Sequence, residues 1–287
     1  MQSDNLKEIV RAIIPRPLRN SLRSPSRSAE WLWDSMCFTL GVTKELTVLP
    51  GSVMVCHPHV YKTVLRSQVV DPDQSDEFRN FVEHCNDRMF LFDIGASFGV
   101  FSLAAAHFGG RVVAVDPSPM ATRLIRIQIA LNGCEGNIEV LRASASDASG
   151  VIEMLNSGMF SNGYFKVAKG RPKRELTKTR AITIDEMTTQ FGAPTHIKID
   201  VEGYEEAVLR GAKKTLTRFS PLLFLELHNE MVLANGSDPK QVLDELAEIG
   251  YEIFGFNGRR LETIAILQKP IVRIVGKRTS RNYPEVS

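Results

Sequence analysis

The sequence predicts an α/β fold in which helices cover both faces of a mainly parallel β-sheet. From Phe90 onward, short apolar runs alternate with amphipathic segments, which is the pattern of successive βα units. The end of the chain differs, because Tyr251–Phe256, the Asn257-Gly258 turn and the run after Arg260 predict a β-hairpin. We therefore expect a sheet of seven strands whose last strand is antiparallel.

Each element follows from its local pattern. Continuous apolar runs indicate buried strands, whereas helices are predicted where apolar residues recur at helical spacing, as in the segment between Asp238 and the capping Gly250. The other predicted strands are Ser52–Val60, as an extended or hairpin segment, the run ending at Asp93, Val112–Val115, Ile138–Leu141, Val151–Leu155, Arg180–Ile184, Thr195–Val201 and Pro221–His228. The predicted helices are Asp76–Arg88, one beginning near Val100, one opening at Asp185, Glu205–Phe219 and Asp238–Ile249.

Length and composition set the domain organisation. With 287 residues, of which 43% are hydrophobic, the chain can bury a full core. We expect a partly ordered N-terminal extension at 1–50, a cap or lead-in segment at 51–89, the α/β domain at 90–270 and a basic tail at 271–287. The four cysteines form no CxxC pair, and no signal-peptide core or 18-residue apolar run is present. These observations predict reduced thiols, no membrane span and a cytoplasmic protein.

The most informative motif lies at Leu91–Gly99 and continues into the next strand. Asp93 ends an apolar run, Gly95 permits a tight turn close to a ligand, and Gly99 admits the start of a helix. Asp116 ends the second strand 23 positions after Asp93, where a carboxylate can accept hydrogen bonds from a ribose diol. The motif therefore predicts a nucleoside site.

A dinucleotide is the rival ligand for this site. It would require glycines at positions 95, 97 and 100, whereas the chain has Gly95, Ser97 and Val100, so S-adenosylmethionine is the favoured cofactor. An acid at position 93 would suit its ammonium group, and a small polar segment at 143–147 would receive its adenine. The predicted cofactor-binding residues are Asp93, Gly95, Ala96, Gly99, Asp116, Pro117, Ser144 and Asp147.

Three segments of the chain carry a family resemblance. LFDIGASFGVFSL at 91–103, IKIDVEGYEEAVLRGA at 197–212 and FLELH at 224–228 resemble the FkbM family of class I S-adenosylmethionine-dependent methyltransferases. The similarity spans about residues 90–230, and the middle segment is the most specific. Ser97 departs from the family pattern, which often has Asn there. The resemblance implies a Rossmann-like fold and methyl transfer to a hydroxyl of a sugar, glycan or secondary metabolite.

Ionisable residues follow the fourth and fifth main strands. Lys198, Asp200 and Glu202 are spaced by two and project to one side while the strand persists, as do Glu226 and His228 on the next strand. Ligands of an open parallel sheet lie beyond the carboxyl ends of its strands. The predicted catalytic residues are therefore Asp200, Glu226 and His228, with His228 favoured as the base and the acids as its orienting groups or as direct proton acceptors.

Two other interpretations of this cluster stay open. Asp200 and Glu226 could bind Mg²⁺ through oxygen ligands and so acidify the acceptor hydroxyl. Alternatively, Lys198 pairs with Glu226 or Asp200 inside the sheet and Glu202 caps the following helix, both as structural contacts. We name no metal ligand on this basis, and Mg²⁺ remains a secondary expectation.

Charge patterning bears on partners. Basic residues gather at 166–180 and in the Arg-rich N-terminus, although the net charge is only +2. We expect a small-molecule or glycan substrate, with an anionic one as an option for the basic loop, and no nucleic-acid partner. A homo-oligomer is an option that the sequence leaves open. The alternatives are a nucleic-acid or protein methyltransferase of the same fold and a cofactor-binding protein without catalysis.

Overall fold

The computed structural model describes residues 33, 36–37, 40–49, 52–58, 61–62, 72–155 and 176–278. The chain divides into two compact units, Met1–Arg66 and Ser67–Ser287. In the first unit, β1 (Lys44–Leu49) and β2 (Ser52–Cys56) pair as an antiparallel hairpin, which confirms the extended segment predicted after residue 51. No helix in the described part of the chain is long and apolar enough to cross a membrane.

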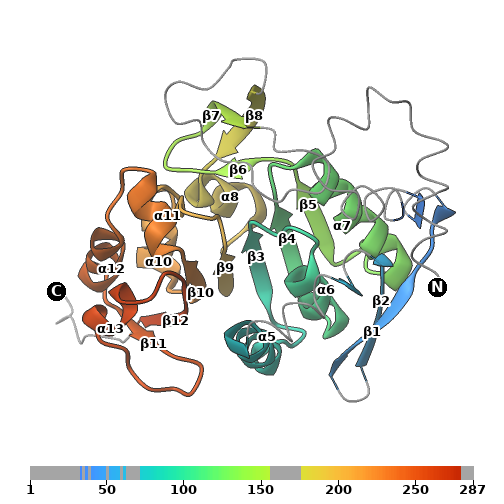
Figure 1. The fold of residues 1–287 in the computed structure, drawn as a ribbon, viewed down its shortest axis with the longest axis horizontal. Coiled ribbons are helices and arrows are strands. Elements are labelled where there is room, and N and C mark those ends of the chain that lie inside the picture. Colours follow the sequence, from blue (N-terminus) through green and yellow to red (C-terminus); the bar gives the residue numbers. More distant parts are fainter. Residues whose placement is uncertain are drawn as a thin grey trace, which may run out of the picture. The chain divides into compact units, whose positions relative to one another are not determined.

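A seven-stranded sheet forms the centre of the second unit (Figure 1). Its spatial order is β11-β12-β10-β9-β3-β4-β5, and only β12 runs antiparallel to its neighbours. This confirms the predicted fold class, including the antiparallel last strand. The strands are β3 (Phe90–Ile94), β4 (Arg111–Val115), β5 (Ile138–Leu141), β9 (His196–Ile199), β10 (Leu222–Leu227), β11 (Tyr251–Phe254) and β12 (Val272–Arg278).

Helices connect these strands. Successive residues of β3, β4 and β10 are buried whichever side they point to, as expected for a sheet covered on both faces. The helices are α5 (Pro72–His84), α6 (Val100–His107), α7 (Pro119–Asn132), α8 (Ile184–Phe191), α9 (Glu205–Arg210), α10 (Lys213–Phe219), α11 (Asn229–Ala234), α12 (Pro239–Glu248) and α13 (Thr263–Leu267).

The predicted C-terminal hairpin is wrong in its connection. A single bridge joins Phe254 to Arg260, but α13 then intervenes, and the partner of β11 is β12. Because β12 lies between β10 and β11, the sheet extends through Arg278, into the segment that we expected to be a basic tail. A strand that lies between two others can be marked in the sequence by only a short alternation of apolar residues. The charged residues that flank this alternation in β12 hid the strand in the sequence.

The helix predicted over Glu205–Phe219 is two helices, α9 and α10, which meet at Gly211. A Cβ at Gly211 would lie 2.0 Å from the carbonyl oxygen of Ser146, so only glycine allows this close approach. The strands predicted around residues 151 and 180 exist as β7 (Gly150–Leu155) and β8 (Leu176–Ile182), but they form a separate three-stranded sheet with β6 (Ser144–Ala145).

Helix α5 belongs to the α/β unit through a cluster of aromatic rings. Phe81 packs edge-on against Phe101 of α6 and Phe224 of β10, with ring centroids 5.0 and 5.2 Å apart. Phe78 makes the same kind of contact with Phe101. This packing turns one face of α5 toward the sheet and carries Glu77 into the interior, where it is 1% exposed.

Candidate active site

The loop after β3 turns back onto the end of β4. The backbone amides of Gly95 and Ala96 donate to the carbonyl oxygen of Val115 at 2.9 and 3.0 Å. Gly95 has a φ of +79°, and a Cβ there would lie 1.8 Å from the carbonyl oxygen of Asp200. Gly95 therefore lets the loop after β3 meet the loop after β9, which brings the predicted cofactor segment against the predicted catalytic segment.

Asp116 lies at the end of β4 and holds the two loops beside it. Its carboxylate oxygens accept hydrogen bonds from the backbone amides of Ser97, at 2.9 Å, and Ser118, at 2.8 Å. Each oxygen keeps a lone pair for a further donor. Burial raises the pKa of Asp116 to about 7, although the two amide hydrogen bonds oppose the shift. Pro117 lies between Asp116 and Ser118, and its predicted role in cofactor binding stays a prediction.

Asp93 faces the interior. It is 1% exposed and accepts a hydrogen bond from the hydroxyl of Ser102 on α6 at 2.6 Å. Burial raises the pKa of Asp93, while Lys198 and Ser102 lower it. The contact of Asp93 with a cofactor ammonium stays a prediction, and in this structure one oxygen of the carboxylate is bonded to α6.

The segment predicted to receive adenine is fixed by two contacts. Ser144 pairs with Ala181 in β8, and Ser146 lies against Gly211 at the end of α9. Asp147 is exposed and accepts a hydrogen bond from the hydroxyl of Ser146. An adenine-binding role for Ser144 and Asp147 stays a prediction, as does the role of the basic loop, of which residues 166–175 lie outside the described part of the chain.

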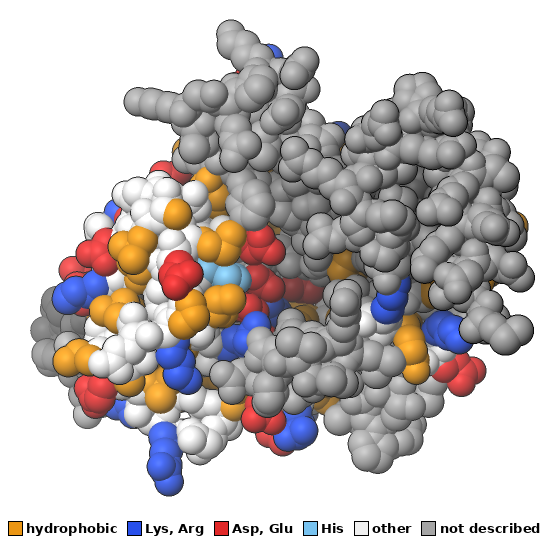
Figure 2. Space-filling view, viewed as in Figure 1, with side chains coloured by type: hydrophobic (Ala, Val, Ile, Leu, Met, Phe, Trp, Pro, Cys, Tyr) orange, Lys and Arg blue, Asp and Glu red, His pale blue; other side chains and the backbone are white. Residues whose placement is uncertain are grey.

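Asp200, Glu226 and His228 converge at the carboxyl ends of β9 and β10. One ligand atom from each lies within 4.8 Å of the others. The Nε2 atom of His228 is 3.5 Å from Glu226 and 4.0 Å from Asp200. Asp200 keeps 30% of its side chain exposed, whereas the other two are almost completely buried. Figure 2 shows acidic side chains gathered around a histidine in the region of β9 and β10.

Beneath this surface lies a buried charge network. Lys198 of β9 lies 3.7 Å from Asp200 and 3.8 Å from Glu77 of α5. Arg273 of β12 pairs with Glu77 at 3.5 Å and donates to Glu226 at 2.7 Å. Of the two partners that the sequence offered for Lys198, Glu226 and Asp200, the structure pairs it with Asp200, and Glu77 and Arg273 were not predicted. Two signals for these residues were available in the sequence: the charge of Glu77 on the apolar face of α5, and the charge of Arg273 inside a strand.

A third residue missed from the sequence is Glu205, the first residue of α9. Its Oε1 atom accepts hydrogen bonds from Nδ1 of His228 at 2.8 Å and from the backbone amide of Gly203 at 3.0 Å. The side chain is fully buried. Its position three residues after Glu202 placed it on a predicted helix, which concealed its contact with the next strand.

The contacts set different ionisation states for the three converging residues. Burial opposes the charge on His228, but its bonds to Glu205 and Glu226 outweigh this and raise its pKa to about 10. Burial raises the pKa of Asp200 to about 6 against the opposing charge of Lys198. Burial also disfavours charge on Glu226, but His228, Lys198 and Arg273 together lower its pKa to about 2.

These contacts weigh against the prediction that His228 is the base. Nδ1 lies against Glu205 and Nε2 faces two carboxylates, which favours the doubly protonated imidazole, and this form has no lone pair to accept another proton. Asp200 is the partly exposed group whose pKa lies just below neutral, so it is ionised and accessible at pH 7.

The donor set does not fit Mg²⁺. Mg²⁺ prefers oxygen ligands, but one of the three converging groups is an imidazole whose Nδ1 is already bonded to Glu205. Glu226 is already ion-paired to Arg273. Charge in the cluster is therefore balanced by cationic side chains, and we assign no step to a metal.

Glu202 has an uncommon backbone conformation. Its φ of +49° lies in the left-handed region, which costs a non-glycine residue roughly 1 kcal/mol or more. Gly203, also left-handed, follows, and a Cβ there would lie 2.8 Å from the Cβ of Met231. The side chain of Glu202 interacts electrostatically with His228, so the strained turn presents a further carboxylate to the cluster.

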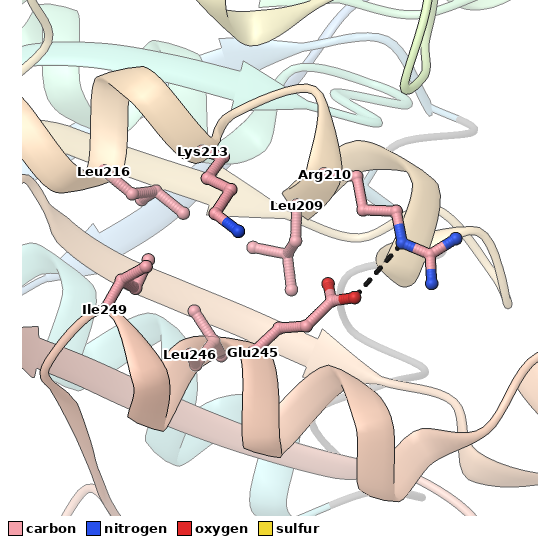
Figure 3. Close-up of a pocket in the computed structure, with 7 residues that line it drawn as sticks. All are labelled: Leu209, Arg210, Lys213, Leu216, Glu245, Leu246 and Ile249. Carbon is pink, nitrogen blue, oxygen red and sulfur yellow. Dashed lines mark hydrogen bonds and ion pairs between the residues drawn. The ribbon is translucent and has the colours of Figure 1, made fainter.

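A pocket between α9, α10 and α12 lies elsewhere (Figure 3). Its floor is apolar, with Leu209 and Ile249 among its lining residues, and Arg210 bonds to Glu245 at its rim at 3.1 Å. None of the predicted catalytic or cofactor residues lines it.

Comparison with known proteins gives a match over the same region. The model of the methyltransferase FkbM domain matches residues 93–253, which include the loop after β3 and the ends of β9 and β10. The chain is 27% identical over 177 residues to the hexuronic acid methyltransferase AglP of Haloferax volcanii, covering 61% of this chain and 68% of that protein.

Two further matches are more restricted. A ribosomal protein L11 methyltransferase of Pelotomaculum thermopropionicum is 40% identical over 55 residues, which cover 19% of this chain and 18% of that protein. The crystal structure of an FkbM methyltransferase from Methylobacillus flagellatus KT aligns with a TM-score of 0.44 and 19% identity over 67% of this chain. This alignment spans less than half of that longer protein, 44% of its chain.

Proposed function

Because the chain belongs to the FkbM family of methyltransferases, we propose that it transfers a methyl group from S-adenosylmethionine to a hydroxyl group of a sugar, a glycan or a secondary metabolite. The observation that carries this proposal is the contact between the two loops. Gly95, in the cofactor motif, abuts the backbone of Asp200, the accessible carboxylate of the acidic cluster. A methyl donor held by one loop would therefore lie beside a base carried by the other.

The residues after β3 and β4 fit a nucleoside. Gly95 and Gly99 leave the loop without side chains at two left-handed positions, and Asp116 retains lone pairs for a ribose diol. When bound, S-adenosylmethionine supplies an electrophilic methyl group on a sulfonium sulfur. We assign to Asp116 the binding of the ribose, and to Gly95, Ala96 and Gly99 the close approach of backbone to the ligand.

Asp200 is the proposed general base. As the new carbon–oxygen bond forms, the acceptor hydroxyl loses its proton to the Asp200 carboxylate, and the carbon–sulfur bond breaks with its electrons returning to sulfur. Lys198 and His228 keep Asp200 ionised, because both cations lower its pKa against the effect of burial. Glu226 accepts a hydrogen bond from Arg273 and faces Nε2 of His228, so it holds the edge of the imidazole ring opposite Glu205.

The relative AglP is named a hexuronic acid methyltransferase, which supports testing hexuronic acids first and neutral hexoses beside them. Purified full-length protein should bind S-adenosylmethionine in a calorimetric titration and incorporate labelled methyl groups into one of these acceptors. Asp200→Asn should keep its affinity for the cofactor and lose about 10²- to 10⁴-fold in kcat. Asp244→Asn, at an exposed Asp on α12, is the matched control and should leave kcat unchanged.

Each of these experiments has an outcome that would contradict the proposed function or the proposed role of Asp200. If S-adenosylmethionine does not bind, the proposed function is wrong. Full turnover by Asp200→Asn would remove Asp200 as the base. EDTA should not reduce the rate, and a rate restored only by added Mg²⁺ would show that the cluster acts through a metal.

A further inference from the structure

The pair formed by Glu205 and His228 stands behind the proposed base. The Nδ1–Oε1 distance is 2.8 Å, and both side chains are buried. Nδ1 of His228 donates this bond to the carboxylate oxygen of Glu205. This bond fixes the imidazole ring with Nε2 directed toward Asp200 and Glu226.

Glu205 is itself held in one place. The amide of Gly203 donates to the same oxygen that accepts from His228, and the second oxygen, Oε2, is buried with no hydrogen-bond partner in the described part of the chain. A fully buried carboxylate is costly unless it is paired, so the bond to His228 is the main interaction that offsets its desolvation. His228 and the Gly203 amide therefore both bond to the same oxygen atom of Glu205, Oε1.

We propose that Glu205 is the positioning residue of this active site, holding His228 as a fixed cation that orients Asp200 and Glu226 for proton transfer. The inference rests on the proposed function and extends it to a residue that touches neither substrate nor cofactor. It requires that the charge of His228, and not only its bulk, depends on Glu205. The ion pair of Glu205 and His228 would then set the ionisation of Asp200 through space.

Other charged groups face the same residues and must be counted. His228 also faces Asp200, Glu226 and Glu202, so loss of Glu205 would weaken but not abolish its positive charge. With His228 less charged, Asp200 would lose one of the two cations that favour its ionised form. The charged groups that act on Asp200 are Lys198, Glu226, His228 and Glu202, and Asp200 in turn acts on Glu77 and Asp116.

The test is Glu205→Gln, which keeps the size of the side chain and removes its charge. In an NMR titration of the histidine ring nitrogens, the midpoint for His228 should move down by about 1 to 3 pH units relative to the wild type. The acid limb of the kcat profile should move to higher pH, with kcat at pH 7 falling about 10- to 100-fold as expected for a displaced reacting group. The affinity for S-adenosylmethionine and the acceptor KM should stay unchanged.

Glu206→Gln is the matched control. Glu206 is the next residue of α9 and is also buried, but it pairs with Arg210 instead of His228. It should leave both the His228 titration and the pH profile as in the wild type. An equal fall of kcat in both variants, without movement of the pH profile, would show a purely structural role and overturn the proposal.

The wild-type titration keeps the proposal testable even if Glu205→Gln does not fold. His228 should remain protonated well above pH 7, and a midpoint near 6.5, the ordinary value for histidine, would overturn the inference. The NMR measurement needs no substrate. A protein that shows the coupled pair but transfers no methyl group would contradict the proposed function alone.

Discussion

Lys198→Met should destabilise the α/β unit, and the loss should grow as the pH rises. Lys198 is 2% exposed, and its ammonium lies 3.7 Å from Asp200, 3.8 Å from Glu77 and 4.4 Å from the ring centre of Phe101. The carboxylates outweigh the effect of burial and raise the pKa of Lys198. Methionine has a similar length and leaves these carboxylates without their central cation.

The expected size follows from the ionisation of the acids. Removing one partner of a buried ion pair costs about 3 to 5 kcal/mol when the other stays charged. Burial, partly opposed by Lys198, already raises the pKa of Glu77 to about 7. Without Lys198 that pKa would rise further, so the folded variant would hold a proton that the unfolded chain releases near its ordinary value of 4.5.

The sign of the pH effect follows directly. A carboxyl group whose pKa is raised by folding favours the folded state at low pH, and this contribution is lost as the pH rises through the folded-state pKa. Wild-type Glu77, with a pKa of about 7, is mostly protonated at pH 6 and mostly ionised at pH 8. A variant that keeps this proton throughout should therefore lose about 1.4 kcal/mol more than the wild type over this range.

Urea unfolding followed by circular dichroism at pH 6 and pH 8 measures this difference. Lys214→Met, at an exposed lysine of α10, should change the free energy of unfolding by less than about 0.5 kcal/mol at either pH. The double variant Lys198→Met/Glu77→Gln should recover part of the lost stability at pH 8, because it removes a buried carboxylate that has lost its cation. A loss that is equal at both pH values, or below about 1 kcal/mol at pH 8, would refute the reasoning.

Two further predictions concern the cofactor loops. Gly95→Ala should destabilise the protein by about 2 to 5 kcal/mol and weaken cofactor binding, because its Cβ would overlap the carbonyl oxygen of Asp200 at a left-handed φ. Thermal unfolding measures this effect, with Gly136→Ala as the control because a Cβ there meets nothing within 4 Å. Equal melting temperatures of the two variants would contradict the prediction. The affinity for S-adenosylmethionine should rise up to about tenfold from pH 6 to pH 8, because burial raises the pKa of Asp116 to about 7 and the ribose hydroxyls need its ionised form. Asp116→Asn should bind more weakly and without this pH dependence in calorimetry, whereas a wild-type affinity independent of pH would exclude Asp116 as the titrating group.

The sequence by itself determined the sheet and the placement of most site residues. Alternating βα units require parallel strands, and parallel strands bring their carboxyl ends to one edge, so residues as distant in sequence as Asp200 and His228 could be placed together without coordinates. Gly95 and Asp116 were recognisable because a tight turn and a strand-end carboxylate leave a local signature.

Tertiary structure decided what these residues are chemically. Glu77 comes from α5 and Arg273 from β12, the strand inserted between β10 and β11, and no local pattern links either to the site. The pKa of a buried group depends on every charge within a few ångströms and on its desolvation, both of which are set by long-range packing. For this reason the sequence identified His228 as a site residue, but only the tertiary structure brings it against Glu205, a contact that favours its charged form and on which our proposal of Asp200 as the base depends.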